Sequence, residues 1–180
     1  MSFRVSPENS LLGILMTGPK HGYELHGYIC SKMNQFWQLN MSQVYALLKR
    51  MEANGLVVSD EELQENRPPK KIFSLTQKGK QRFVRWVSSP VEHVRDMRME
   101  FMAKLYFAKE LQPEGGVGIL IDKQVRVLEE KLRAMEDSRE GITDNFQGVL
   151  YSFKTAQTTA VLNWLKQCKA SFSKSGKHEN

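Results

Sequence analysis

Cysteine is scarce in this sequence, and long apolar runs are missing. Its two cysteines, Cys30 and Cys168, lie far apart in a chain of 180 residues, which argues against a disulfide framework and favours a reducing compartment. The longest apolar run near the N-terminus, residues 11–16, is far too short to span a membrane. Residues 1–10 lack the apolar core of a signal peptide. We therefore expect a soluble, cytoplasmic protein without a membrane partner.

The residue patterns that mark metal sites and enzymes are also missing. The histidines show no metal-ligand spacing with the cysteines; they are His21, His26, His93 and His178. The sequence also contains no phosphate-binding loop, no paired carboxylates and no nucleophile beside a base. We therefore expect no catalytic residues, no metal and no cofactor.

Positive charge is what the chain does contain. Its net charge is +6 and its isoelectric point is near 9.3, values that suit an acidic partner. Between residues 67 and 85 the basic residues occur without an acidic residue among them: Arg67, Lys70, Lys71, Lys78, Lys80, Arg82 and Arg85. A basic segment of this kind is typical of surfaces that meet nucleic acid.

Residues 40–55 predict a short helix with well-marked ends. Four apolar residues recur at the spacing that places them on one side of a helix: Val44, Leu47, Leu48 and Met51. Asn40, followed three residues later by Gln43, fits a capping box at the N-terminus of this helix. Gly55 fits the left-handed residue that ends a helix.

The outer face of this predicted helix is small and polar. Successive residues lie 100° apart around a helix, so Ser42, Ala46 and Lys49 lie opposite the apolar side. Gln43, Tyr45 and Arg50 flank them. Small residues surrounded by hydrogen-bond donors suit a helix that lies close against base edges. The alternative interpretation is an ordinary solvated helix face.

The segments around this helix complete a small mixed fold. Ser6 and Pro7 predict the start of a first helix, turn residues at 17–22 end it, and a second helix covers residues 21–33. In that second helix we expect four residues to be buried: Tyr23, Leu25, Ile29 and Met33. Short β-prone runs at 57–58 and 72–75 predict a hairpin with a basic returning arm. Thr76 then caps a helix over residues 77–88.

The second half of the sequence is helical. A helix is expected over residues 97–111, followed by a heptad pattern typical of a helix seam, made of Gly118, Ile121, Val125, Leu128, Leu132 and Met135. A last helix, at 144–171, carries a line of apolar residues: Phe146, Val149, Leu150, Phe153, Ala160, Val161 and Trp164. The predicted fold class is mainly α with a small β-hairpin wing. Residues 1–92 form a winged helix-turn-helix domain, 93–172 a helical dimerisation domain, and 173–180 a disordered tail.

Four blocks, in order, resemble the PadR family of bacterial transcriptional regulators, over residues 11–111. They are His21–Leu25, Gln43–Val57, Phe73–Gly79 and Glu100–Phe107. The length is similar to the longer, AphA-like subgroup with a two-helix C-terminal domain. The sequence departs from the pattern of the family at two places. Ala46 stands where many members have proline. In the wing, residues 66–69 and 72–73 differ from those that many members carry. The resemblance implies a homodimer that binds a near-palindromic operator, with repression as the leading expectation.

These expectations assign roles to named residues. In the major groove, Ser42, Gln43 and Lys49 are expected nearest the bases, with Tyr45 on a phosphate and Arg50 on the flank. The wing residues Arg67, Lys70 and Lys71 are expected on the adjacent DNA backbone or in the minor groove. The residues expected at the dimer interface are Ile121, Val125, Leu128, Leu132, Met135, Phe153 and Trp164. Packing within one chain is the alternative for the 118–135 seam.

Other functions remain open at this stage. A winged helix that contacts proteins instead of DNA is one alternative. Another is a regulator that binds a small aromatic effector in a pocket lined by Trp37, Trp86 and Trp164. The alternative for these three residues is packing in the core. Cys30 is expected to be a small buried hydrophobe. Cys168 lies near Lys166 and Lys169, which would lower its pKa in a redox sensor.

Overall fold

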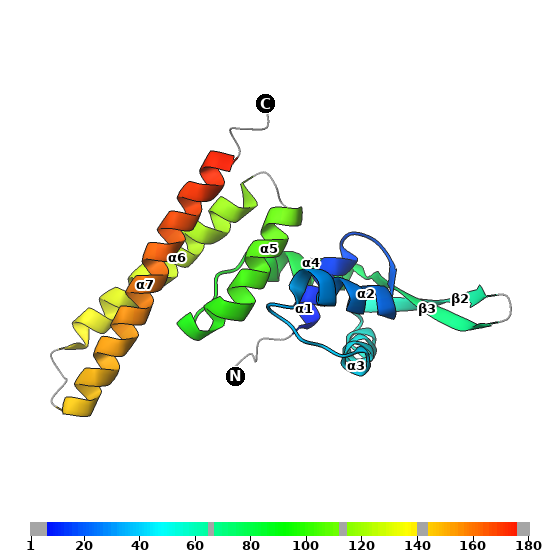
Figure 1. Cartoon of the computed structure of the whole chain (residues 1–180), viewed down its shortest axis with the longest axis horizontal. Helices are drawn as coiled ribbons and strands as arrows, with labels where there is room; N and C mark the ends of the chain where they lie inside the picture. Colours follow the sequence, from blue (N-terminus) through cyan, green and yellow to red (C-terminus); the bar gives the residue numbers. More distant parts are fainter. Residues whose placement is uncertain (1–6, 65–66, 112–114, 140–143, 176–180) are drawn as a thin grey trace. The chain divides into compact units, whose positions relative to one another are not determined.

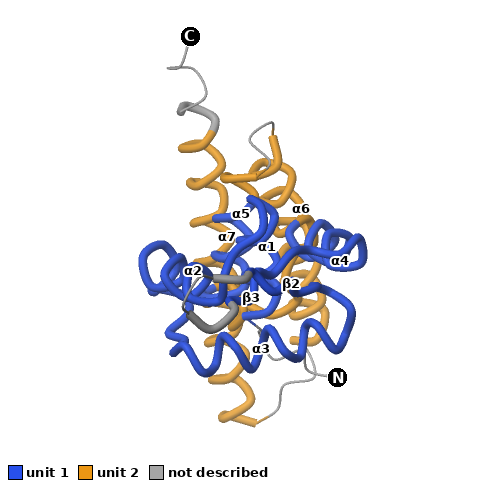
Figure 2. Tube along the Cα trace, turned by 90° about the vertical axis from the view of Figure 1, so that its right-hand side faces the viewer, with its two compact units in different colours: residues 1–87, 98–107 blue, residues 88–97, 108–180 orange. Residues whose placement is uncertain are grey.

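The chain is mainly helical with one small antiparallel sheet, as the sequence predicts (Figure 1). The computed structural model describes residues 7–64, 67–111, 115–139 and 144–175. Two compact units are present (Figure 2): residues 1–87 with 98–107, and residues 88–97 with 108–180. Segment 98–107 thus belongs to the first unit. The functional division of the chain at residue 92 stays a prediction.

Three helices open the first unit: α1 (Glu8–Leu15), α2 (Gly22–Tyr28), which continues as a π-helical turn (Ile29–Met33), and α3 (Met41–Ala53). Leu25, Ile29 and Met33 are fully buried, as predicted, because a spacing of four places them on one side of α2. The predicted burial of Tyr23 is wrong: its side chain is about half exposed. Pro7, rather than Ser6, is the residue preceding α1, and Ser6 lies outside the described residues.

The sheet has three strands in the order β1-β3-β2: β1 (Lys20–His21), β2 (Val57–Gln64) and β3 (Arg67–Leu75). We call the hairpin formed by β2 and β3 the wing. Its strands are longer than the predicted runs, because the polar residues between those runs also pair across the hairpin. Strand β1 was not predicted. It forms where the expected turn at 17–22 pairs with Phe73 and Ile72 of β3.

The wing leads into α4 (Gln77–Val87), which Thr76 caps as predicted. The Thr76 hydroxyl accepts a hydrogen bond from the Gly79 amide at 3.0 Å, the usual role of an N-cap threonine. A Cβ atom at Gly79 would lie 2.1 Å from the Leu56 carbonyl oxygen, so only glycine lets α4 approach the start of the wing this closely.

The first unit is completed by residues 98–107, which include most of a π-helical turn (Met97–Phe101) and the first part of α5 (Met102–Leu111). The ring of Phe107 meets that of Phe83 edge-on, with 5.6 Å between ring centres. Lys104 is 2% exposed, and its ammonium group is 3.1 Å from the Glu100 carboxylate. That pairing offsets the cost of burying a charged amine.

The second unit contains a short 3-10 turn (Val94–Asp96) and two long helices that lie side by side, α6 (Gly116–Asp137) and α7 (Asn145–Ser175). The buried side chain of Gln124 accepts a hydrogen bond from the Val91 amide and donates one to the Val91 carbonyl. α7 continues to Ser175, three residues into the predicted tail, and residues 176–180 lie outside the described residues. None of the described helices combines the length and apolar character needed to cross a bilayer.

Candidate nucleic-acid interface

Helix α3 begins and ends at the residues that the sequence predicts. The Asn40 side chain accepts a hydrogen bond from the Gln43 amide at 2.9 Å, and the Asn40 amide donates to the Gln43 side chain at 2.9 Å. Gly55, two residues after the helix, has a φ of +65°. The left-handed conformation is one that glycine adopts without strain, so the helix ends there. Local chemistry therefore fixes both ends of α3.

The side chains of α3 divide as the helical period requires. Val44, Leu48 and Met51 are fully buried, whereas Leu47 is half-buried. The opposite side is exposed, and it comprises Ser42, Gln43, Tyr45, Ala46, Lys49 and Arg50. The structure thus presents together the six residues of the predicted outer face. Their contact with DNA stays a prediction.

Two of these exposed residues already have partners within the chain. The amide oxygen of Gln43 accepts the Asn40 N–H in the capping box, so any contact of this oxygen with adenine would share it with that bond. Arg50 lies 2.5 Å from the carboxylate of Glu8, a side chain only 8% exposed, which also binds Arg82 at 3.0 Å. Arg50 therefore joins α3 to α1, a structural role that the sequence did not reveal.

Tyr45 is held by its neighbour α2. Its ring packs against Gly22, at the first residue of that helix, and 43% of the side chain is exposed. This contact fixes the ring plane while part of the side chain still faces solvent. The arrangement is compatible with the predicted phosphate contact.

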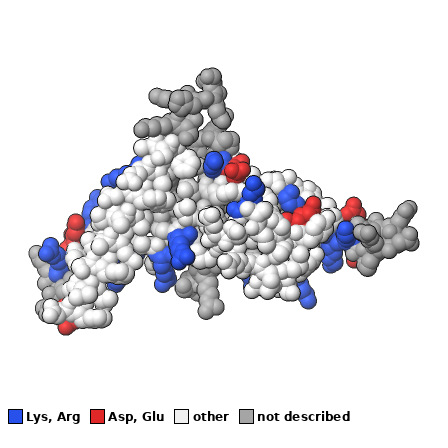
Figure 3. Space-filling view, viewed as in Figure 1, with Lys and Arg blue, Asp and Glu red and all other residues white. Residues whose placement is uncertain are grey.

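The wing is not the uninterrupted basic surface that its returning strand suggests. Across the hairpin Glu61 pairs with Lys71 and Glu62 pairs with Lys70. Over residues 57–75 the acidic residues outnumber the basic ones, because Asp60 and Glu65 add to these two glutamates against three basic residues. On the face drawn in Figure 3, acidic and basic side chains lie next to each other toward the end of the hairpin. The run of basic residues along the sequence did not reveal that acidic residues stand opposite it on the partner strand.

The predicted wing residues differ in what surrounds them. The Lys70 ammonium lies 5.3 Å from the ring centre of Tyr23, a cation–π contact, and Lys71 is exposed. The side chain of Arg67 lies outside the described residues. On α4, Lys78 donates to the Asn54 carbonyl at 2.9 Å and Arg82 binds Glu8, so both contribute to packing around α3.

Helix α7 presents a large apolar stripe. Phe146, Val149 and Phe153 are 66, 61 and 57% exposed, and Leu150 lies between them at 40%. Their spacing places all four on one side of the helix. Among the predicted interface residues, Phe153 faces solvent on this stripe. The others are wholly or partly buried within the second unit: Ile121, Val125, Leu128, Leu132, Met135 and Trp164.

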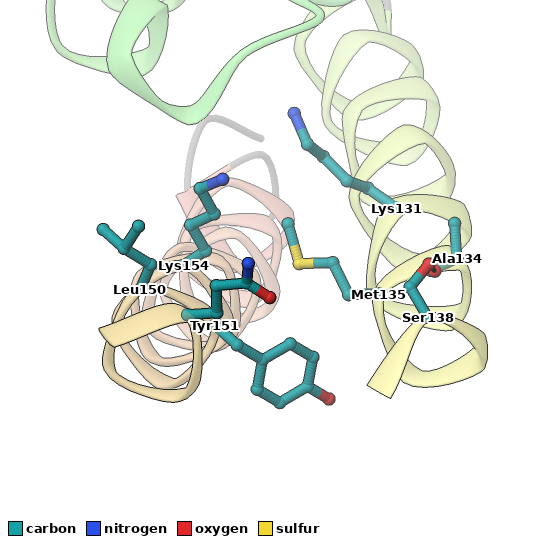
Figure 4. Close-up of a pocket in the computed structure, with 8 residues that line it drawn as sticks. Lys131, Ala134, Met135, Ser138, Leu150, Tyr151 and Lys154 are labelled. Carbon is teal, nitrogen blue, oxygen red and sulfur yellow. Dashed lines mark hydrogen bonds between the residues drawn. The ribbon is translucent and has the colours of Figure 1, made fainter. Parts of the chain in front are cut away.

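A hollow of about 400 Å³ lies between the end of α6 and the start of α7. Figure 4 shows side chains of both helices around it. The lining residues are Lys131, Ala134, Met135, Ser138, Gln147, Leu150, Tyr151 and Lys154. No tryptophan lines this hollow, so it is not the tryptophan-lined pocket that the sequence left open as an alternative. Trp37 is a core residue that donates to the Ser10 hydroxyl, and Trp86 donates to Glu100.

The cysteines behave differently from the predictions. Cys30 is exposed, not buried, because it follows Ile29 and is rotated away from the buried side of its helix. Burial raises the pKa of the Cys168 thiol, which argues against the redox sensor that its lysine neighbours left open as an alternative. Among the described residues, no group of three or more metal-ligating side chains could hold a metal ion.

Comparison with known proteins concerns mainly the first half of the chain. The family model described as "Transcriptional regulator PadR-like family" matches residues 11–85. The negative transcriptional regulator PadR of Bacillus subtilis is 32% identical over 98 residues, which cover 54% of either chain. The probable transcriptional regulator Rv1176c of Mycobacterium tuberculosis is 30% identical over 90 residues, covering 50% of this chain and 48% of the relative. The chain thus matches about half the length of these curated relatives.

Solved structures resemble the chain over a greater length and at lower identity. The crystal structure of Bacillus subtilis PadR in complex with operator DNA is 24% identical and covers 90% of this chain and 97% of that one, with a TM-score of 0.47. The same protein in complex with p-coumaric acid gives 24% identity, coverage of 93% and 95%, and a TM-score of 0.40.

Proposed function

We propose that the chain, whose residues 11–85 match the PadR-like family of transcriptional regulators, is a member of that family and represses transcription as a homodimer bound to a near-palindromic operator. The observation that carries this proposal is the exposed face of α3, where small and donor side chains lie together on a helix capped at both ends. A regulator of bacterial genes meets its operator in the cytoplasm, so we also place the protein there.

In this proposal α3 enters the major groove. Ser42 and Ala46 are short enough to let the helix backbone approach the bases, while Lys49 reaches an acceptor on guanine. A well-formed side-chain pair with one base discriminates by about 1–3 kcal/mol. Tyr45 donates its hydroxyl to a phosphate and sets the register of the helix without reading sequence. Gln43 contributes less than its residue type suggests, because its oxygen is already used in the helix cap.

The wing follows the adjacent DNA backbone through Arg67, Lys70 and Lys71. Its carboxylates lower the attraction, because each one repels the phosphates that the lysines attract. We therefore propose that the wing helps to position α3 in the major groove, and that α3 provides most of the affinity for the bases. The overall affinity should still fall steeply as the salt concentration rises. Each neutralised phosphate contributes a slope near −0.9 when log K is plotted against the logarithm of the salt concentration.

Dimerisation supplies the second recognition helix. An exposed apolar stripe on one helix is unfavourable in water, and a second copy of the chain offers the same stripe for burial. We propose that Phe146, Val149, Leu150 and Phe153 form the centre of this interface. Two α3 helices related by a twofold axis then meet successive major grooves, about 34–36 Å apart.

Effector binding is a second candidate function, supported by the hollow between α6 and α7. Met135, Leu150 and the Tyr151 ring provide apolar contacts there, and Lys131 with Lys154 provides positive charge. This combination suits a small aromatic acid, the class to which the p-coumaric acid bound by Bacillus subtilis PadR belongs. Quenching of tyrosine and tryptophan fluorescence by such acids tests the idea. No catalytic role is proposed, because the curated relatives are transcriptional regulators.

Selection of bound duplexes from a random pool tests the main proposal. We expect enrichment of two inverted half-sites spaced about one helical turn of DNA. If the purified protein retains no duplex more strongly than a neutral control protein does in dilute buffer, the proposal fails. A winged helix that contacts proteins instead of DNA would give that outcome.

A further inference from the structure

A cluster of five residues connects the start of α2 to the wing. We call it the wing-base cluster, and it comprises His21, Tyr23, Glu62, Lys70 and Lys71. Strand β1 places His21 beside Ile72 of β3, so its ring lies over the base of the wing. The side chain is only 13% exposed, whereas Glu62 remains about half exposed. The proposed DNA contacts do not include His21, Tyr23 or Glu62.

The imidazole of His21 bridges both strands of the wing. Its Nδ1 atom is 3.1 Å from the Lys71 carbonyl oxygen, and its Nε2 atom is 3.1 Å from a Glu62 carboxylate oxygen. A carbonyl oxygen and a carboxylate only accept hydrogen bonds. Both ring nitrogens can donate at once only when the imidazole carries two protons. The geometry therefore fits the charged form of His21, because the neutral ring loses one of the two bonds.

The backbone of His21 is fixed as well. Its amide donates to the Glu24 carboxylate at 2.7 Å, which ties the residue to the first turn of α2. The rings of His21 and Tyr23 stack with 5.4 Å between their centres, and the Lys70 ammonium lies 5.3 Å from the centre of the Tyr23 ring. Charged residues come from every element packed around the ring: Lys20, Glu24, Asp60, Glu62, Lys70 and Lys71.

The next residue along the chain, Gly22, is the one against which Tyr45 of α3 packs. The path from α3 to the wing is thus Tyr45, Gly22, His21 and then Glu62 with the Lys71 carbonyl. We propose that His21 is a positioning residue, which holds the wing at a fixed angle to α3 and does so most firmly when its ring is doubly protonated. This inference rests on the proposed DNA-binding function and deepens it by naming a determinant of operator preference.

The test compares His21→Gln with the unaltered protein. Its matched control is His26→Gln, in the adjoining helix α2, whose ring lies 3.6 Å from the Cys30 sulfur. The probes are a labelled duplex selected from the random pool and a scrambled duplex of the same composition. The measured quantity is the ratio of the two dissociation constants at about pH 6 and about pH 8, on either side of the range in which histidine titrates.

We expect the unaltered protein and His26→Gln to prefer the selected duplex more strongly at the lower pH. His21→Gln should lose about tenfold of this preference, the worth of one charge-assisted hydrogen bond, and should show no difference between the two pH values. Binding to the scrambled duplex should change little, because no proposed phosphate contact is removed.

A second pair of variants covers the case in which His21→Gln fails to fold. Glu62→Gln removes a partner of His21, whereas Glu61→Gln makes the same charge change at the neighbouring position, paired across the hairpin with Lys71. Both should bind DNA more tightly overall, but only Glu62→Gln should lower the preference and its pH dependence.

The inference alone is overturned if the unaltered protein prefers the selected duplex and the His21 and Glu62 variants keep that preference with its pH dependence. If the unaltered protein shows no preference for any duplex, the proposed function and the inference both fail.

Discussion

The ring of Tyr45 occupies the space that a side chain on Gly22 would need. An ideal Cβ atom at Gly22 would lie 2.6 Å from the Cζ atom of Tyr45 and 2.8 Å from its hydroxyl oxygen. Helices α2 and α3 therefore meet at this point only because residue 22 is glycine. The contact also explains why glycine stands at the start of α2, where the sequence pattern alone suggests only a turn.

Replacing Gly22 with alanine should force Tyr45 out of its position. Overpacking of this kind destabilises proteins by about 1–3 kcal/mol, and the displaced ring should also weaken operator binding. Thermal unfolding and DNA binding measure the two effects. Gly27→Ala is the matched control in the same helix, because nothing lies within 4 Å of its Cβ position, and it should leave stability equal or higher. Equal melting temperatures for the two variants would contradict the packing role of Gly22.

The pairing of Glu8 with two arginines should stabilise the first unit. Glu8→Gln removes the charge that holds Arg50 and Arg82 together, so we expect a loss of about 1–2 kcal/mol. The loss is smaller than for a fully buried pair because both arginines are partly exposed to solvent. Denaturant unfolding measures it, with Glu92→Gln on an exposed residue as the control. A loss no greater than that of the control would show that the pairing contributes little.

The apolar stripe on α7 should mediate dimerisation. Phe153→Asp places a charge on the stripe and should weaken self-association at least tenfold, since burying an unpaired carboxylate is costly. Sedimentation at micromolar concentration should show a dimer for the unaltered protein and a monomer for the variant. Thr159→Asp adds the same charge on an exposed part of α7 away from the stripe and should stay dimeric. A monomeric unaltered protein would exclude this interface.

The raised pKa of Cys168 predicts slow reaction with alkylating agents. Its proton is retained above the ordinary value of 9.0, so at about pH 8 less thiolate is present than in an unperturbed cysteine. Exposed Cys30 should therefore be alkylated first, and the rate at Cys168 should rise as the pH passes 9. Mass spectrometry after timed exposure to iodoacetamide resolves the two sites. Faster modification of Cys168 would restore the redox-sensor hypothesis that the burial argues against.

The same linkage predicts a small loss of stability at high pH. The unfolded chain releases the Cys168 proton at a lower pH than the folded chain does, so the free energy of unfolding should fall as the pH rises above the unfolded pKa. Cys168→Ser should remove this part of the pH dependence.

Features set by residues close in sequence could be predicted, as α3 illustrates. Its capping box and terminal glycine involve neighbours within a turn, and its buried side follows from the helical period. The position of Tyr23 was also open to prediction, because it lies two residues before Leu25 and thus on the far side of the helix. Its burial was predicted from the apolar character of the tyrosine ring and not from the angular position of the residue around the helix.

Features set by pairing across the chain could not be predicted. Strand β1 exists because Lys20 and His21 meet β3 some fifty residues later, and no local pattern marks two residues as a strand. The charge of the wing is another case, since Glu61 and Glu62 stand opposite Lys71 and Lys70 only in the folded hairpin. The partners of Glu8 likewise come from helices distant in sequence. Such contacts decide which of the predicted basic residues are available to DNA.

The most direct test of the central claim is the binding of Lys49→Glu to the selected duplex across a range of salt concentrations. Lys49 lies on the exposed face of α3 with no burial to disturb, so the variant should fold normally and lose at least about tenfold in affinity. Lys109→Glu makes the same charge change on an exposed residue of α5 and should bind almost like the unaltered protein. If Lys49→Glu binds the duplex as tightly as Lys109→Glu at moderate salt, α3 does not read DNA and the account is contradicted.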